Sequence, residues 1–262
     1  MKIAVAQIKC VLGDVAANCA RMAALTEQAC EQGCEVIVFP EMSDTGYEIE
    51  VIKEKACTWD ELPYATLKKA AMQNKMHIIA GISERVDKHI YNTSAVFNPR
   101  GRLVGRYRKA HLFPVVPVCE DRHITAGKAL EIVNIGGLKV GLFICYDLRF
   151  PELARALTLK GADVLVVVAA WQFPRVSHWN TLLSARAIEN QTYVVAANRV
   201  GTDGPTTFCG SSRIIDPYGV IVASAAEDRD ELIIGEIKPD TIQWVRDRMP
   251  VLEHRREDVY RS

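Results

Sequence analysis

The sequence predicts an α/β protein, a four-layer α-β-β-α sandwich in which helices cover the outer faces of two stacked mixed sheets. Apolar segments typical of strands alternate with segments of helical periodicity along the chain of 262 residues, and this alternation is typical of α/β domains. Glycine-containing turns join consecutive strands, and such hairpins add antiparallel pairs to the parallel ones. About a dozen strands exceed one comfortable open sheet, so we expect two sheets packed face to face.

Strands and helices are located by their apolar patterns and by the residues that stop them. Residues 15–32 carry apolar side chains at helical spacing and end at Gly33, and the apolar residues 35–39 end at Pro40. The expected strands are residues 2–7, 35–39, 77–82, 91–97, 103–108, 130–135, 138–144, 164–169, 193–198, 211–215, 220–224 and 231–237. The expected helices are residues 15–32, 64–74, 152–160, 177–191 and 241–248. Three turns indicate hairpins, NPRG at 98–101, GG at 136–137 and DPYG at 216–219.

The composition is that of a globular protein without a strongly charged surface. Apolar residues make up 49% of the chain, and 32 basic residues balance 32 acidic ones. This balance argues against nucleic acid or an anionic membrane as the natural partner, and it leaves self-association open because net repulsion is small. No linker interrupts the pattern, so we expect residues 1–262 to form one domain whose C-terminal tail, residues 249–262, packs at a dimer interface.

The cysteines and the N-terminal segment indicate a cytoplasmic protein. The first residues, MKIAVAQIKC, alternate like a strand and lack the features of a targeting signal. No apolar run reaches the ~18 residues that a membrane-spanning helix needs. We therefore expect the eight cysteines to be reduced thiols. Cys30 and Cys34 are close in sequence but have no second pair and no nearby histidine, so we expect no zinc site there.

Three polar residues each follow a predicted strand at a turn. Glu41 follows VIVFP, Lys109 follows GRYR, and Cys145 follows GLFI. Sites in α/β proteins gather at the carboxyl ends of strands, where loops present side chains over a rigid edge. Each residue alone has an ordinary structural interpretation, as a helix cap, a solvated charge or an apolar core residue.

The three residue types have complementary chemistry. A thiol becomes a strong nucleophile only as the thiolate, so Cys145 needs a base. Glu41 can be that base if burial raises its pKa toward neutrality. The ammonium group of Lys109 can stabilise negative charge that develops on a carbonyl oxygen. Together they indicate acyl transfer through a covalent cysteine intermediate.

Three motifs, VIVFPEM, YRKAHLF and ICYDLRFPE, resemble those of the nitrilase superfamily, the carbon–nitrogen hydrolases. The family's Glu–Lys–Cys triad maps onto Glu41, Lys109 and Cys145, with the family's order and spacings of 68 and 36 residues. A second glutamate, which supports the lysine in many relatives, maps onto Glu120. The resemblance covers nearly the whole chain. It implies the α-β-β-α sandwich and a homodimer in which C-terminal segments cross between subunits.

The resemblance also implies a mechanism that needs neither a metal nor an organic cofactor. Glu41 takes the proton of the Cys145 thiol, and the sulfur attacks an amide carbonyl carbon. Lys109 and the backbone N–H of Tyr146 hold the oxyanion. Ammonia leaves with the proton from Glu41, and water that Glu41 deprotonates then hydrolyses the thioester.

The residues after Cys145 indicate a branch of the superfamily. True nitrilases usually carry Trp-Glu there, whereas this chain has YDLRFPE, which resembles the amidase branches with omega-amidase and the Nit proteins. Such enzymes deaminate 2-oxoglutaramate and related ω-amides, whose carboxylate calls for a cation opposite the amide. Arg149 is the first candidate and Arg175 the second. Equally, Arg149 could pair structurally with Asp147 or Glu152.

Aromatic residues near the motifs are candidates for pocket walls. Tyr47, Trp171 and Phe173 could enclose a small substrate, although aromatic side chains are just as often ordinary core residues. Two other amidase activities of the superfamily stay open, on N-carbamoyl compounds and on deaminated glutathione. A non-catalytic binding module on the same fold is the alternative from another class, and a thiol redox sensor is a further one.

Overall fold

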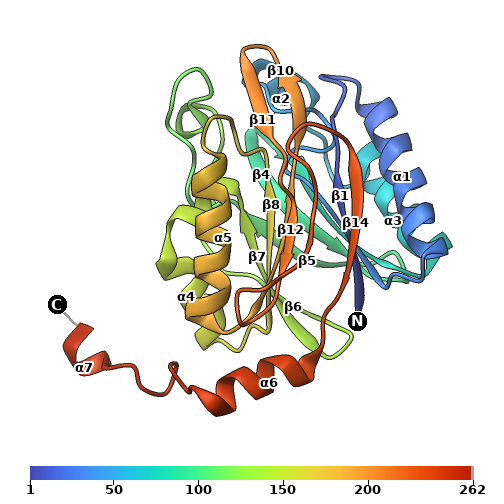
Figure 1. The fold of residues 1–262 in the computed structure, drawn as a ribbon. Coiled ribbons are helices and arrows are strands. Elements are labelled where there is room, and N and C mark those ends of the chain that lie inside the picture. Colours follow the sequence, from blue (N-terminus) through green and yellow to red (C-terminus); the bar gives the residue numbers. More distant parts are fainter. Residues whose placement is uncertain (261–262) are drawn as a thin grey trace.

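The protein folds as four layers, in the order helix, sheet, sheet, helix (Figure 1). The computed structural model describes residues 1–260. On one side, α1 (Val15–Glu31) and α3 (Leu62–Asn74) cover the outer face of a six-stranded sheet. On the other side, α4 (Pro151–Leu159) and α5 (Val176–Asn190) cover a second six-stranded sheet. The predicted α-β-β-α sandwich is confirmed.

The first sheet is built from the N-terminal half of the chain and the last strand. Its order is β14 (Glu231–Glu236), β1 (Lys2–Gln7), β2 (Val36–Phe39), β3 (His77–Val86), β4 (His89–Phe97) and β5 (Leu103–Arg108). β1, β2 and β3 are parallel to one another. β4 is antiparallel to both β3 and β5, so β5 runs in the same direction as β2. The carboxyl ends of β2 and β5 therefore lie at the same edge of the sheet.

The second sheet is built from the C-terminal half. Its order is β13 (Ile221–Ser224), β12 (Arg213–Ile215), β9 (Tyr193–Asn198), β8 (Val164–Ala169), β7 (Leu138–Ile144) and β6 (Ile132–Ile135). β7, β8 and β9 are parallel, so their carboxyl ends share one edge. A short hairpin, β10 (Val200–Asp203) with β11 (Thr206–Cys209), stands apart from both sheets.

Local sequence explains where the helices begin and end. Asp14 caps α1 by accepting a hydrogen bond from the Ala17 N–H at 2.9 Å. Gly33 follows α1 with a φ of 74°, the left-handed conformation that suits glycine at helix ends. A proline lies in the first turn of both α3 and α4, where the missing N–H leaves no intrahelical bond unmade.

Alternating side chains along β1 fill two separate cores. Ile3 and Val5 pack between the two sheets, whereas Ala4 and Ala6 pack toward α1 and α3. None of the four is more than 1% exposed. Burying one Val or Ile side chain contributes about 1.5–3 kcal/mol. A register slip of one residue would exchange the two faces of the strand, so this pattern fixes the register.

Some parts of the fold are absent from the predicted elements. The helix α2 (Ile49–Lys55) and the hairpin of β10 and β11 lie in stretches expected to be connections. α2 has seven residues, too few for its periodicity to stand out. β3 also extends to Val86, beyond the expected end at residue 82. The three predicted hairpins are all present.

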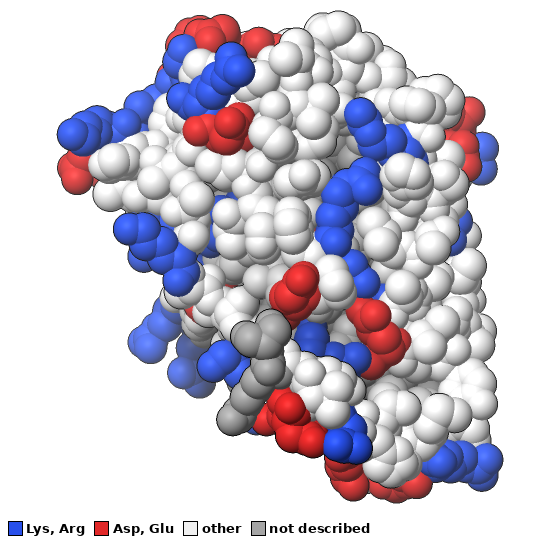
Figure 2. All heavy atoms as spheres, turned by 90° about the vertical axis from the view of Figure 1, so that its left-hand side faces the viewer, with Lys and Arg blue, Asp and Glu red and all other residues white. Residues whose placement is uncertain are grey.

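The C-terminal segment runs along one end of the sandwich and then leaves it (Figure 1). It contains α6 (Pro239–Arg248) and α7 (Glu257–Tyr260). Trp244, Met249 and Tyr260 are 46%, 60% and 62% exposed. Residues 261 and 262 of the predicted tail lie outside the described residues. Figure 2 shows charges of both signs interspersed with wide uncharged areas on the face that carries α4 and α5.

Candidate active site

Three strands from both sheets bring the predicted triad together. Glu41 lies one residue beyond Pro40 at the end of β2, and Lys109 directly follows β5 in the same sheet. Cys145 directly follows β7 in the other sheet and begins a 3₁₀ turn, Cys145–Arg149. The three side chains lie in one buried cluster between the sheet edges.

Both oxygens of the Glu41 carboxylate are hydrogen-bonded. Oε1 accepts from Lys109 Nζ at 2.8 Å and from Asn92 Nδ2 at 2.6 Å. Oε2 accepts from the backbone N–H of Ala170, at the end of β8, at 2.7 Å. The residue is 0% exposed. These donors lie in β4 and directly after β5 and β8, so the carboxylate is fixed in place by both sheets.

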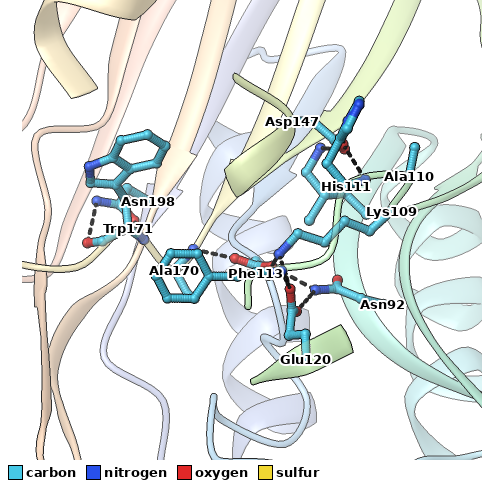
Figure 3. Close-up of polar contacts among 12 residues, drawn as sticks. Asn92, Lys109, Ala110, His111, Phe113, Glu120, Asp147, Ala170, Trp171 and Asn198 are labelled. Carbon is cyan, nitrogen blue, oxygen red and sulfur yellow. Dashed lines mark hydrogen bonds and ion pairs between the residues drawn. The ribbon is translucent and has the colours of Figure 1, made fainter. Parts of the chain in front are cut away.

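Lys109 lies between two carboxylates. Its Nζ donates to Glu41 Oε1 at 2.8 Å and to Glu120 Oε2 at 2.7 Å. Glu120 also accepts from Asn92 Nδ2 at 2.9 Å and from the Phe113 N–H at 2.8 Å. Figure 3 shows Lys109, Asn92 and Glu120 pointing toward one another. Glu120 is predicted from the sequence, whereas Asn92 is not. The only signal for Asn92 is that it is a polar residue in the alternating strand β4.

Burial and neighbouring charges shift the pKa values of this cluster. Burial by itself lowers the pKa of Lys109, but the charges of Glu120 and Glu41 outweigh it and raise the pKa above the usual lysine value. Burial raises the pKa of Glu41, and Glu120 raises it further, against the opposing effect of Lys109. Lys109 therefore stays an ammonium group, while Glu41 is a stronger base than an exposed glutamate.

The Cys145 thiol lies beside the Glu41 carboxylate and is not a preformed thiolate. Burial raises its pKa well above the ordinary value, and the Glu41 charge adds to this, while Lys109 lowers it. Cys145 has a φ of 45°, in the left-handed region that costs a residue with a Cβ about 1 kcal/mol or more. This turn directs the thiol at the neighbouring base instead of continuing the strand.

Gly81 on β3 allows the close approach that positions Glu41. A Cβ atom at residue 81 would lie 2.5 Å from the Cα of Glu41 and 2.6 Å from the Pro40 carbonyl oxygen. The Gly81 N–H donates to that same carbonyl at 3.1 Å. Any larger residue would push the turn that carries Glu41 away from the sheet.

A pocket of about 290 Å³ opens onto Cys145. It is lined by Tyr47, Phe113, Cys145, Tyr146, Arg149, Ala170, Trp171, Gln172 and Arg175. Five of the six residues proposed as substrate-binding are in this set, and Phe173 is not, because its side chain points outward and is 59% exposed. Phe113 and Gln172 were missed, although each lies close in sequence to a residue that was proposed.

The wall formed by Trp171 is fixed by its neighbours. The Trp171 N–H donates to Asn198 Oδ1 at 2.7 Å, and its ring Nε1 donates to the Arg175 carbonyl at 2.9 Å. Figure 3 shows Asn198 beside Trp171, next to Ala170 and Phe113. Asn198 ends β9, and no pattern in the sequence places it near the site.

Arg149 and Arg175 have no ion-pair partner within residues 1–260. The Arg149 guanidinium lies 4.6 Å from the Trp171 ring centre, and its Nη1 is 3.5 Å from His178 Nδ1. Arg175 Nη1 is 3.5 Å from Gln172 Oε1. Burial lowers the pKa of Arg149, opposed by the charge of Cys145 and assisted by that of Arg175. Two unneutralised cations therefore flank the nucleophile.

The structural interpretation of Arg149 as a partner of Asp147 or Glu152 does not hold. The Asp147 carboxylate is occupied by Tyr107 and His111. No ion pair joins Arg149 to Glu152 within the described chain. Among residues 1–260, no group of three His, Cys, Asp or Glu side chains is arranged to hold a metal ion. No helix in that range is long and apolar enough to cross a membrane.

The chain is similar to known amidases along most of its length. The 2-oxoglutaramate amidase of Bacillus subtilis is 38% identical over 227 residues, which cover 86% of each chain. The deaminated glutathione amidase of Escherichia coli O157:H7 is 36% identical over 245 residues, which cover 89% of each chain. The crystal structure of the C. elegans NitFhit protein matches with a TM-score of 0.92 at 31% identity, covering 99% of this chain and 66% of that longer one.

A family model described as carbon-nitrogen hydrolase matches residues 2–247. This match confirms the enzyme class that the motifs around Glu41, Lys109 and Cys145 predict, a hydrolase of carbon–nitrogen bonds. The resemblance to the nitrilase superfamily is confirmed with it. The chain therefore belongs to the carbon–nitrogen hydrolase family.

Proposed function

We propose that this enzyme hydrolyses the ω-amide of a small dicarboxylate-derived acid, 2-oxoglutaramate first among them, with Glu41, Lys109 and Cys145 as its catalytic residues. The observation that carries the proposal is the pairing of two features in one pocket. Cys145 lies beside a buried base, and Arg149 and Arg175 line the same walls without an acidic partner in the described chain. A substrate with an amide at one end and a carboxylate at the other satisfies both.

Acylation begins when the Cys145 thiol passes its proton to Glu41 as the sulfur attacks the amide carbonyl carbon. The carbonyl oxygen becomes an oxyanion, which the Lys109 ammonium and the backbone N–H of Tyr146 hold. One such donor is worth about 3–4 kcal/mol in the barrier. The carbon–nitrogen bond then breaks, Glu41 gives its proton to the leaving nitrogen, and ammonia departs from a thioester on Cys145.

Deacylation repeats the same steps with water. Glu41 takes a proton from a water molecule, whose oxygen attacks the thioester carbonyl. The carbon–sulfur bond breaks, the acid product forms, and Cys145 regains its proton from Glu41. The hydrogen bonds to both Glu41 oxygens support this role, because they hold the carboxylate in place through both halves of the reaction.

The size and charge of the pocket favour a short anionic substrate. The pocket is small, with an empty volume of about 290 Å³ that includes space open to solvent. A charge-assisted hydrogen bond contributes about 1.5–3 kcal/mol, so one carboxylate between Arg149 and Arg175 would decide substrate orientation. The similarity to the B. subtilis 2-oxoglutaramate amidase supports this choice. Deaminated glutathione is the second candidate, favoured by the similarity to the E. coli enzyme.

We also propose that residues 1–262 form one domain, and that the protein is a cytoplasmic homodimer with residues 249–262 at the interface. The exposed apolar side chains of Trp244, Met249 and Tyr260 support an interface at this end of the molecule. The eight cysteines are all free thiols, which supports a reducing compartment.

Product release across a substrate panel tests the proposed activity, with ammonia measured for the primary amides and the N-carbamoyl compound, and the freed amine cysteinylglycine measured for deaminated glutathione, whose hydrolysis frees no ammonia. The panel contains 2-oxoglutaramate, succinamate, deaminated glutathione, glutamine and an N-carbamoyl amino acid, each with the wild type and with Cys145→Ala. We expect the highest kcat/KM for the two ω-amides and no release by the variant. A higher kcat/KM for the N-carbamoyl compound or deaminated glutathione would overturn the substrate assignment. Wild-type turnover by Cys145→Ala would overturn the mechanism.

A further inference from the structure

One buried carboxylate connects the strand end that carries Lys109 to the turn that carries Cys145. Asp147 Oδ2 accepts from the Tyr107 hydroxyl at 2.8 Å and from the Ile144 N–H at 3.0 Å. Its Oδ1 accepts from the His111 N–H at 3.0 Å and is 2.7 Å from His111 Nδ1. Asp147 is 0% exposed. Figure 3 shows His111 and Asp147 together beside Lys109.

The positions of these donors in the sequence are the informative feature. Tyr107 and His111 lie two residues before and two residues after Lys109, and Ile144 and Asp147 lie on either side of Cys145. Lys109 belongs to the end of β5 in the first sheet, whereas Cys145 follows β7 in the second. The carboxylate therefore links the two sheets directly at the point where sulfur and ammonium must meet.

Further contacts hold the two side chains that bind Asp147 in place. The Tyr107 hydroxyl also accepts from the Ala110 N–H at 3.2 Å, so it joins the backbone beyond Lys109 to the carboxylate. The His111 ring stacks on Phe150, with ring centres 3.7 Å apart and planes 10° apart. Asp147 contacts the segments that carry Lys109 and Cys145, and within the described residues no hydrogen bond joins it to either of those two side chains. Its effect on the nucleophile is geometric.

We propose that Asp147, with Tyr107 and His111, is a positioning device that sets the separation between Lys109 Nζ and Cys145 Sγ. The inference rests on the catalytic roles proposed above for those two residues. None of the three touches the substrate pocket, so loosening the link changes the reactivity of the thiol and kcat and leaves KM unchanged. Misplacement of a reacting group by about 1 Å is enough to cost up to a hundredfold in rate.

Two matched tyrosine variants test the device. Tyr107→Phe removes the hydroxyl that donates to Asp147, and Tyr64→Phe removes another buried tyrosine hydroxyl, which has no hydrogen-bond partner within the described residues. The two residues are 1% and 2% exposed. For each variant, kcat, KM and the urea-unfolding midpoint are measured, together with the rate at which iodoacetamide alkylates Cys145, followed on its peptide by mass spectrometry.

We expect Tyr107→Phe to lower kcat and the Cys145 alkylation rate roughly tenfold, with KM within twofold of the wild type. Tyr64→Phe should match the wild type in all three. If Tyr107→Phe shifts only the unfolding midpoint, Asp147 is merely structural and the proposal fails. The alkylation rate needs no amide substrate, so an error in the proposed substrate would not mimic this failure.

A second pair of variants tests the contact between His111 and Asp147. The His111 side chain is 34% exposed, so its replacement leaves no large buried cavity. His111→Asn keeps a donor close to the position of Nδ1, whereas His111→Ala removes it. We expect the asparagine variant to retain most of kcat and of the alkylation rate, and the alanine variant to lose about tenfold in both. Equal values for the two variants would contradict the proposed link.

Discussion

Lys109 Nζ lies 2.8 Å from Glu41 Oε1, although the two residues are 68 positions apart in the sequence and both are 0% exposed. The lysine also donates to Glu120, so one ammonium group faces two carboxylates. Burying such a group is costly unless it is paired on several sides. The cluster keeps one carboxylate as a base while the ammonium remains charged beside the nucleophile.

Removing the ammonium group tests its role in catalysis. We expect Lys109→Met to lower kcat/KM by at least a hundredfold, because the oxyanion loses a charged donor worth about 3–4 kcal/mol. The loss also leaves Glu41 and Glu120 buried without a cation, which further impairs the base. Lys69→Met, on the exposed side of α3, is the matched control and should equal the wild type. Comparable kcat/KM values in steady-state ammonia release would refute the role of Lys109.

The raised pKa of Glu41 predicts where activity is lost at low pH. Only the deprotonated carboxylate accepts the thiol proton, so kcat/KM falls as the pH drops through the pKa of Glu41. Burial raises that pKa above the ordinary glutamate value. We therefore expect the acid limb of the pH profile to lie above the range of a solvent-exposed glutamate. The acid limb is measured with a substrate whose own carboxyl group stays ionised over the whole pH range of the profile. An acid limb at or below the ordinary value would show that Glu41 is not the base.

The high pKa of Cys145 predicts the pH dependence of its reactivity in the free enzyme. Burial holds the thiol protonated at neutral pH, so attack requires proton transfer at the moment of reaction. The rate of Cys145 alkylation by iodoacetamide should keep rising up to at least about pH 9. A plateau that begins below neutral pH would indicate a preformed thiolate and a different mechanism.

The two arginines in the pocket should act on the binding of the substrate carboxylate. We expect Arg149→Gln and Arg175→Gln to raise KM for 2-oxoglutaramate by roughly tenfold or more each, since a charge-assisted hydrogen bond is worth about 1.5–3 kcal/mol. Hydrolysis of a neutral amide such as propionamide should change little in either variant. The comparison of KM for the two substrates makes the measurement specific, and unchanged KM for 2-oxoglutaramate in both variants would remove the carboxylate role.

Asp44 predicts a dependence of stability on pH that is separate from catalysis. Its carboxylate is 0% exposed and accepts from the Ser83 N–H and hydroxyl. Burial raises its pKa from 3.8 to about 6. The folded state therefore binds the proton more tightly, so this contribution to stability is full below pH 4 and is lost as the pH rises through about 6.

A variant that cannot ionise isolates this contribution. Relative to Asp44→Asn, the free energy of unfolding of the wild type should fall by about 2.4 kcal/mol between pH 4 and pH 7. Urea unfolding at several pH values measures the difference between the two proteins. A difference that is constant across that range would show that Asp44 does not titrate as described.

The sequence was sufficient for the elements and residues that local patterns define. Residues such as Pro40 and Gly33 mark where a strand or helix ends. Patterns of this kind located the strands of both six-stranded sheets and the helices that cover them. Glu41, Lys109 and Cys145 could be found because each directly follows a strand and because the motifs around them resemble one family. The three residues converge because β2 and β5 run in the same direction in the first sheet and end near the carboxyl end of β7 in the second. Hairpin and crossover patterns in the sequence already suggest these strand directions.

The remaining parts depend on tertiary contacts that no local pattern records. The hairpin of β10 and β11 is short and polar, and a β-bridge outside the hairpin pairs Phe208 with Gln172 beside the pocket. Asn92 points at Glu41 and Glu120 only because of the register of β4 against β5. Phe173 follows two pocket residues, yet its backbone N–H pairs with the Thr207 carbonyl and its side chain faces outward.

The most direct test of the proposed mechanism is the mass of the Cys145 peptide after 2-oxoglutaramate turnover is quenched in acid. The mechanism predicts an increase equal to the substrate minus ammonia, located on Cys145, removable by hydroxylamine and absent in Cys145→Ser. An unmodified Cys145 peptide, together with wild-type ammonia release by Cys145→Ala, would contradict it.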